Sequence, residues 1–105
     1  MTEPLRLSKH HGLGNDFVVA LEARNPGLVA GAGLAVALCD RHRGIGADGM
    51  FFGLAPGVDD VDLRMVLFNA DGSEAEISGN GIRCLAQAEL RRRGEREGTV
   101  VVDGR

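Results

Sequence analysis

The segment at residues 76–86 reads EISGNGIRCLA and brings together residue types that can do chemistry: a hydroxyl, two glycines, an amide and a thiol. Its pattern predicts that a helix begins near Asn80. Because the first turn of a helix has unpaired N–H groups and a partial positive charge, it can hold a carboxylate or a phosphate. Gly79 and Gly81 would let such a ligand approach the backbone, and Ser78 has the alternative role of a helix N-cap.

Both cysteines are predicted to pack in the interior rather than to react. Cys84 lies about one and a half turns inside the predicted helix, and Cys39 falls on the apolar face of another. A buried cysteine usually behaves as a small apolar residue. The pair Cys39 and His42, even with His10 and His11, lacks the second matched pair of a zinc site, so no metal is expected. Two cysteines are also too few for a disulfide scaffold.

Two polar turns elsewhere contain amides that could bind a ligand. The first, HGLGND at residues 11–16, holds Asn15 and Asp16 just before an apolar run. Both residue types suit turn geometry, and an amide placed here could equally grip a small polar ligand, so both interpretations stay open. The second turn, NADGSE at 69–74, ends a long predicted strand and comes shortly before SGNG. Asn69 could therefore face the same space as the helix start.

Residues 44–49, GIGADG, match the dinucleotide-binding fingerprint G-x-G-x-x-G letter for letter. That fingerprint needs a strand before it and a helix after it, because the pyrophosphate binds at the helix N-terminus. Here a predicted helix precedes the glycines and a predicted strand follows them. We therefore expect the glycines to serve a tight helix-to-strand connection, and nucleotide binding is a weak alternative.

Composition limits the classes of function. The chain has 105 residues, of which 44% are hydrophobic, enough for one domain with a modest core. Its net charge of −3 and its lack of Trp and Tyr argue against nucleic-acid partners and against an anionic membrane. The first residues lack the apolar region of a signal peptide, and the longest apolar stretch is too short to span a bilayer. A cytoplasmic location is expected.

Hydrophobic periodicity divides the chain into short elements. Alternation of apolar and polar residues predicts strands, and apolar residues three or four positions apart predict helices. The result is strand-rich with two helices, which indicates an α+β fold. The expected strands are 5–9, 17–21, 50–54, 61–69 and 98–105, and the expected helices are 34–42 and 80–93.

The ends of these elements can also be predicted. Strands 5–9 and 17–21 would form a hairpin whose turn is longer than two residues. Residues 41–43, all basic, would complete the last turn of the first helix, with Gly44 as its C-terminal cap. The second helix would end at Gly94 and bury an apolar stripe formed by Ile82, Leu85, Ala86 and Leu90.

Four motifs together resemble the N-terminal half of the diaminopimelate epimerases. In order, they are HGLGNDFVV, LCDRHRGIGADG, FNADGSEAE and GNGIRCLA, and the resemblance extends from Lys9 to about Val102. It implies two similar α/β halves, each a sheet wrapped around a central helix, with the active site between them. Residues 1–105 would form the N-terminal domain, and the C-terminal half would be missing from this chain.

The resemblance also implies a reaction without a cofactor. The family inverts the α-carbon of a small amino-acid substrate, converting LL- to meso-diaminopimelate, and each half supplies one acid–base residue. Asn15 and Asn69 would contact polar groups of the substrate. The backbone amides of Gly79 and Asn80 would hold its α-carboxylate and stabilise the charge that develops as the α-proton leaves.

Ser78 stands directly before G-N-G, where the family has its proton-shuttling cysteine. A thiol has a pKa of about 8.5 that a helix N-terminus can lower, whereas a serine hydroxyl is a much weaker acid that needs its own base. Three alternatives follow: an epimerase half, a related isomerase or lyase with altered chemistry, and an inactive remnant that binds an amino acid. Gly49 is a second difference, since the family often has a hydrogen-bonding side chain there. A homodimer could also rebuild the cleft, because the docking face for a missing half would be apolar.

Overall fold

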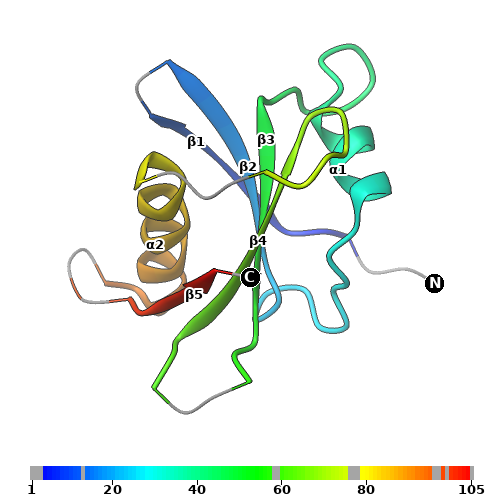
Figure 1. Cartoon of the computed structure of the whole chain (residues 1–105). Helices are drawn as coiled ribbons and strands as arrows, with labels where there is room; N and C mark the ends of the chain where they lie inside the picture. The colour runs from blue at the N-terminus through cyan, green and yellow to red at the C-terminus, as the bar shows by residue number, and fades with distance from the viewer. Residues whose placement is uncertain are drawn as a thin grey trace.

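Five strands and two helices make up the computed structural model of the chain (Figure 1). It describes residues 4–12, 14–57, 60–75, 79–95, 98 and 100–104, with only the backbone described at 12, 79–81 and 103–104. The predicted α+β class is confirmed. The elements are β1 (Leu7–Gly12), β2 (Asn15–Leu21), α1 (Ala32–Cys39), β3 (Gly49–Leu54), β4 (Leu63–Asn69), α2 (Gly79–Arg93) and β5 (Val102–Gly104).

The strands form one mixed sheet in the order β1-β2-β3-β4-β5. The β1–β2 and β3–β4 pairs are antiparallel, whereas β2–β3 and β4–β5 are parallel. Parallel neighbours need a crossover connection, and α1 and α2 supply the two crossovers. In Figure 1 both edge strands, β1 and β5, bend towards α2, and α1 lies on the opposite face. The expected sheet wrapped around a central helix is therefore present.

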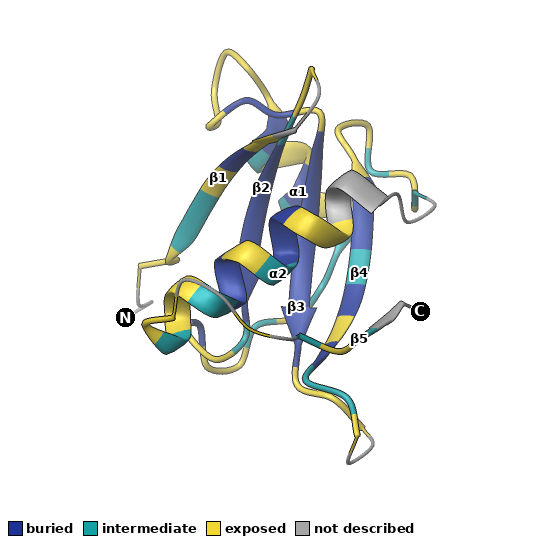
Figure 2. Ribbon diagram, turned by 90° about the vertical axis from the view of Figure 1, so that its left-hand side faces the viewer, coloured by how far each residue is buried: buried dark blue, intermediate teal, exposed yellow. Residues whose placement is uncertain are grey.

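The sheet separates two apolar cores. Successive side chains of a strand point to opposite faces, so Val19 packs with Leu85 of α2, whereas Val18 packs with Ala35 of α1. Figure 2 shows the consequence: the two central strands, β2 and β3, are buried along almost their whole length. An aromatic pair in edge-to-face contact reinforces each core, Phe17 with Phe51 beneath α2 and Phe52 with Phe68 beneath α1.

The first hairpin is tighter than predicted. Gly12 of β1 pairs with Asn15 of β2, so only two residues separate the strands, and the prediction of a longer turn was wrong. Both strands extend into the HGLGND segment, because Gly14 takes a positive φ of 91° that a two-residue connection requires. The last strand, in contrast, is shorter than expected: β5 covers only Val102–Gly104 of the predicted 98–105.

The first helix ends earlier than its basic residues suggested. α1 stops at Cys39, and residues 41–43 form a separate turn instead of the last helical turn. The reason is Asp40, whose side-chain Oδ1 accepts hydrogen bonds from the backbone N–H groups of His42 and Arg43, at 2.8 and 3.2 Å. An aspartate that bonds its own backbone in this way competes with continued helix.

The buried face of α2 is rotated from the predicted stripe. Of the predicted stripe, Leu85 is fully buried, whereas Ala86 and Leu90 are half-buried and Ile82 is 39% exposed; Cys84 and Ala88 join Leu85 in the core. The rotation also buries a charged residue, Glu89, which the hydrophobic pattern could not anticipate. The predicted end of the helix is confirmed: Gly94 has a φ of 77°, and the N–H of Glu95 bonds back to the carbonyl of Leu90.

Glu89 is tolerated in the interior because two arginines neutralise it. Its carboxylate accepts hydrogen bonds from Arg92 Nε and Arg93 Nε, each at 2.7 Å. Arg93 also forms a salt bridge with Asp62 at 3.1 Å, which ties the end of α2 to the start of β4. Within the described residues, neither helix has the length and hydrophobicity that a bilayer crossing requires.

Candidate functional site

One end of the sheet collects amide side chains on the face that α2 covers. The register pairs Phe17 of β2 with Gly49 of β3, and Gly49 with Asn69 of β4. Phe17 belongs to the core beneath α2, so its partners in the register share that face. Asn15 lies two residues before Phe17 and points the same way. Asn15, Gly49 and Asn69 therefore share one face at the end of the sheet, with Asn15 two residues beyond the Phe17–Gly49–Asn69 register, and we call this set the amide row.

α2 begins at this same end of the sheet. In Figure 1 its first turn lies towards the β1–β2 turn and the end of β4, and the helix runs from there to the opposite end. The backbone N–H groups of Gly79 and Asn80 belong to this turn, where the helix dipole is positive. Ser78 and the side chain of Asn80 lie outside the described residues.

The two asparagines of the amide row differ in their surroundings. Asn15 is exposed at the start of β2. Asn69 is also exposed, but its Nδ2 donates to the Oγ of Ser73 at 3.0 Å, inside the turn that follows β4. Asp71 holds that turn closed, since its Oδ1 accepts from both the backbone N–H and the Oγ of Ser73. Asn69 is thus held in place by its own turn.

Asp16, the other polar residue of the first turn, lies on the opposite face of the sheet. Its carboxylate accepts hydrogen bonds from Arg41 at 3.0 and 3.3 Å and forms a salt bridge with Lys9 at 3.2 Å. The hydrogen bonds from Arg41 hold the pKa of Asp16 far below its usual range. Asp16 also exchanges hydrogen bonds with the backbone and side chain of Asp48. Asp16 therefore holds the loop before β3 in place and does not belong to the amide row, whereas Asn15 does.

The glycine-rich segment 44–49 joins α1 to β3, an order opposite to that of the dinucleotide fingerprint. Gly46 is buried with a φ of 85°, and an added Cβ would lie only 3.1 Å from the Cγ of Arg41. Ala47 is buried and bonds back to the carbonyl of Cys39. The glycines allow a tight connection between α1 and β3, and the backbone of this segment forms hydrogen bonds within the fold.

The two cysteines occupy the two separate cores. Cys84 packs beneath α2 and Cys39 beneath α1, so the sheet lies between them. Burial raises the pKa of each thiol, which favours the protonated form. Both thiols therefore act as packing groups, as the sequence predicted. His42 is exposed in the turn after α1, and the described residues contain no group of three His, Cys, Asp or Glu side chains that could hold a metal ion.

The floor of the amide row is a feature that sequence reasoning missed. Gly49 is buried between Phe17 and Asn69 in the register, and the ring of Phe17 lies beside it. A Cβ at Gly49 would come within 3.0 Å of the carbonyl oxygen of Phe68 and 3.3 Å of the Phe17 ring. A side chain there would require the floor to shift. Alternation within each strand places 15 with 17 and 67 with 69, but only the register of the sheet shows that the two pairs share one face.

Comparison with known proteins places the chain in a family. The family model described as diaminopimelate epimerase matches residues 7–105, almost the entire chain. The chain belongs to the diaminopimelate epimerase family. The matched residues include all four motifs on which the resemblance rested, and the amide row and the start of α2 are built from those motifs.

Several relatives in this family are cyanobacterial proteins. The chain is 55% identical over 80 residues to the diaminopimelate epimerase of Microcystis aeruginosa, covering 76% of this chain and 28% of that protein. It is 51% identical over 88 residues to the enzyme of that name from Gloeothece citriformis, covering 82% of this chain and 31% of that protein. The chain thus spans about three tenths of the length of these curated relatives.

A solved structure supports the fold. A phenazine biosynthesis protein of the PhzF family from Bacillus anthracis superimposes with a TM-score of 0.61 at 24% sequence identity. The match covers 94% of this chain and 31% of the other. At this level of identity the likeness concerns the fold alone, a sheet curved around one helix.

Proposed function

We propose that this chain forms the N-terminal half of an epimerase that interconverts LL- and meso-diaminopimelate. The observation that carries the proposal is the amide row beneath the start of α2. Asn15 and Asn69 offer side-chain donors and acceptors on the sheet, and Gly79 and Asn80 offer backbone donors on the helix. This arrangement suits a zwitterionic amino acid, which needs donors for its carboxylate and acceptors for its ammonium group.

The backbone N–H groups at the start of α2 would stabilise the negative charge that develops on the substrate during the reaction. Removing the α-proton leaves a negative charge that spreads into the α-carboxylate. Donors that already point at the carboxylate stabilise this charge without having to reorganise, and such preorganised donors are a major source of catalysis. The Gly79 and Asn80 amides would hold the carboxylate, while the amide row would orient the remainder of the substrate.

Inversion needs a second half. The proton must leave from one face of the α-carbon and return on the other, so two acid–base groups must flank it. This chain contributes one side, at position 78, and the named relatives are more than three times as long as the segment it matches. We propose that the second group comes from a C-terminal half, and that the reaction uses no cofactor.

Ser78 gives a second candidate function. A serine is a poor base for an α-proton, because its hydroxyl is far less acidic than a thiol. A protein that has serine here could exchange or eliminate from one side only, as a related isomerase or lyase, or could bind the amino acid without turnover. These candidates share the binding geometry and differ only in the chemistry at position 78.

A chimaera tests the proposal. This chain would replace the matching N-terminal segment of the Microcystis aeruginosa relative, once with Ser78 and once with Ser78→Cys. In deuterated water, we expect the Ser78→Cys variant to exchange the α-proton and invert diaminopimelate faster by on the order of 10²–10⁴, the usual contribution of one acid–base group. NMR measures the exchange, and chiral chromatography measures the isomer ratio.

Matched variants make the result decisive. Ser8→Cys places a thiol at the other end of the sheet and should give no gain. Exchange without inversion in the Ser78 chimaera would support the one-sided isomerase or lyase. A folded Ser78→Cys chimaera that binds diaminopimelate but neither exchanges nor inverts it would contradict the epimerase proposal.

A further inference from the structure

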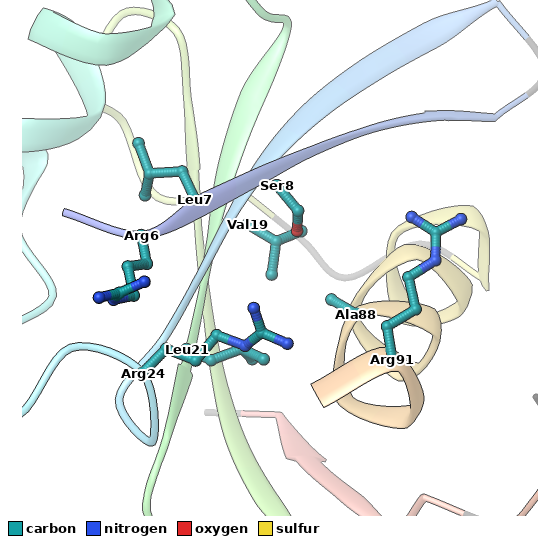
Figure 3. A pocket seen from close by; sticks show the side chains of 8 residues that line it. All are labelled: Arg6, Leu7, Ser8, Val19, Leu21, Arg24, Ala88 and Arg91. Carbon is teal, nitrogen blue, oxygen red and sulfur yellow. The ribbon is translucent and has the colours of Figure 1, made fainter. Parts of the chain in front are cut away.

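A second pocket lies far from the amide row, between the β1–β2 hairpin and the C-terminal half of α2 (Figure 3). Its volume is about 180 Å³. Leu7 begins β1 and Leu21 ends β2, so the pocket is at the opposite end of the sheet from Asn15. Its lining residues come from β1 and the residue before it, from β2 and the segment just after it, and from α2: Arg6, Leu7, Ser8, Val19, Leu21, Arg24, Ala88 and Arg91.

The pocket combines an apolar floor with three cations. Val19 and Leu21 are buried sheet residues, and Ala88 faces them from α2. In Figure 3 the guanidinium of Arg24 lies between Leu21 and Ala88, while that of Arg6 points away from them beside the start of β1 and that of Arg91 points along α2. A floor of this kind favours the hydrocarbon part of a ligand, and the rim favours an anion.

The positive charge of the pocket lining contrasts with the negative net charge of the whole chain. The net charge of the protein is −3, yet three of its arginines line one small pocket. Among the described residues, the arginines in salt bridges are Arg41, Arg92 and Arg93, none of which lines the pocket. The guanidinium of Arg24, which lies over the apolar floor, is therefore the group best placed to meet an anion.

A chain of hydrogen bonds that passes through the buried His10 joins the pocket wall at Ser8 to Gln87 of α2. The Oγ of Ser8 lies 2.8 Å from His10 Nε2, and His10 Nδ1 lies 3.2 Å from the Oε1 of Gln87 on α2. Because an amide oxygen only accepts, Nδ1 carries the proton and Ser8 donates to Nε2.

We propose that this pocket binds a small organic carboxylate with a short apolar body. Arginine presents a planar fork that matches a carboxylate with two parallel hydrogen bonds. The volume is below the roughly 300–1,000 Å³ of pockets that hold drug-sized ligands, so the ligand is short. The site is separate from the amide row, and the proposal does not depend on the proposed function.

NMR titration of the full chain with hexanoate tests the site. Hexanoate should shift the backbone amides of Ser8, Val19 and Ala88 in a saturable way. Hexanamide, which has the same apolar body without the charge, and inorganic phosphate, which has the charge without the body, should bind at least tenfold more weakly. Arg24→Gln should weaken hexanoate binding at least tenfold. Arg64→Gln, an exposed arginine on β4, is the matched control and should leave the affinity unchanged.

Each alternative outcome overturns the proposal in a different way. Equal binding of hexanamide would show an apolar patch only, and equal binding of phosphate would show a general anion patch. Absence of saturable shifts with hexanoate would show that the pocket has no such ligand. An unchanged spectrum for Arg24→Gln apart from local shifts verifies that the variant is folded, so a loss of binding can be assigned to the lost guanidinium.

Discussion

Asn15 and Asp16 are adjacent in β2, but their side chains leave the sheet on opposite faces. Asn15 is exposed beside the start of α2, where a substrate is proposed to bind. Asp16 forms hydrogen bonds with Arg41 and Asp48 on the face of α1 and attaches the loop before β3 to the start of β2. Since that loop leads directly into Gly49, Asp16 helps to position part of the amide row even though its own side chain lies on the other face.

Asp16→Asn tests this structural role. We expect the substitution to lower the free energy of unfolding at neutral pH by about 1–2 kcal/mol, because charged hydrogen bonds are lost but Arg41 is largely exposed. The lowered pKa of Asp16 means that its ionised form stabilises the fold above the unfolded-state pKa of about 3.9, and that this contribution is lost as the pH falls below that value.

Urea denaturation at several pH values measures the effect. Between pH 5 and pH 2, the wild-type chain should lose more stability than Asp16→Asn. Asp60→Asn, at an exposed position, is the control for removing a carboxylate. Parallel pH profiles for the wild-type chain and Asp16→Asn would rule out the proposed role of Asp16.

At the scale of elements, the position of α2 over the sheet depends on a small residue in β3. A Cβ added at Gly53 would lie 2.6 Å from Leu21 Cδ2 and 3.0 Å from Leu85 Cδ1. Leu85 is fully buried at the centre of the α2 face, so little space is left for it to move. The absent side chain at Gly53 therefore allows α2 to approach the sheet, and α2 carries the proposed carboxylate site.

Gly53→Ala should destabilise the chain by about 1–3 kcal/mol through overpacking. Gly33→Ala provides a matched control in α1, where nothing lies within 4 Å of the added Cβ. Because alanine favours helix over glycine, Gly33→Ala should instead stabilise by roughly 0.5–1 kcal/mol. Thermal and urea denaturation compare the two variants. A neutral Gly53→Ala substitution would show that the α2 face has room that the structure does not indicate.

At the scale of the whole molecule, the chain offers one side of the proposed cleft. The amide row and the start of α2 lie at one end of the curved sheet, and the proposed second acid–base group must approach from outside. The first turn of α2 also carries Ile82, an apolar residue that is 39% exposed. A surface of this kind suits contact with another half or with a second copy of the chain.

The chain by itself should not interconvert the isomers of diaminopimelate. Incubation in deuterated water, followed by NMR of the α-position, measures any exchange, and sedimentation of the same sample gives the oligomeric state. We expect no inversion, because one acid–base group cannot serve both faces of the α-carbon. Inversion by a monomer would refute the two-half proposal, whereas inversion by a dimer alone would show that a second copy rebuilds the cleft.

Local patterns predicted most elements but not the details that depend on contacts between them. Apolar runs identified the central strands β2 and β3, alternation identified β4, and Gly94 correctly marked the end of α2. The early end of α1 was missed because the bonds of Asp40 to the backbone beyond it have no signature in periodicity. The buried face of α2 was misassigned because a hydrophobic pattern places a charged residue such as Glu89 on the exposed face. Glu89 can be buried because Arg92 and Arg93 neutralise its charge.

The sequence by itself determined the family, the α+β class and the residues that could bind an amino acid, because motif order and hydrophobic alternation are local properties of the chain. Only the tertiary structure decided how those residues divide. Strand register places Asn15, Gly49 and Asn69 on one face beneath the start of α2 and sends Asp16 to the other. The physical reason is that a side chain's face depends on which strands pair and in what register, and pairing joins residues that are far apart in the sequence.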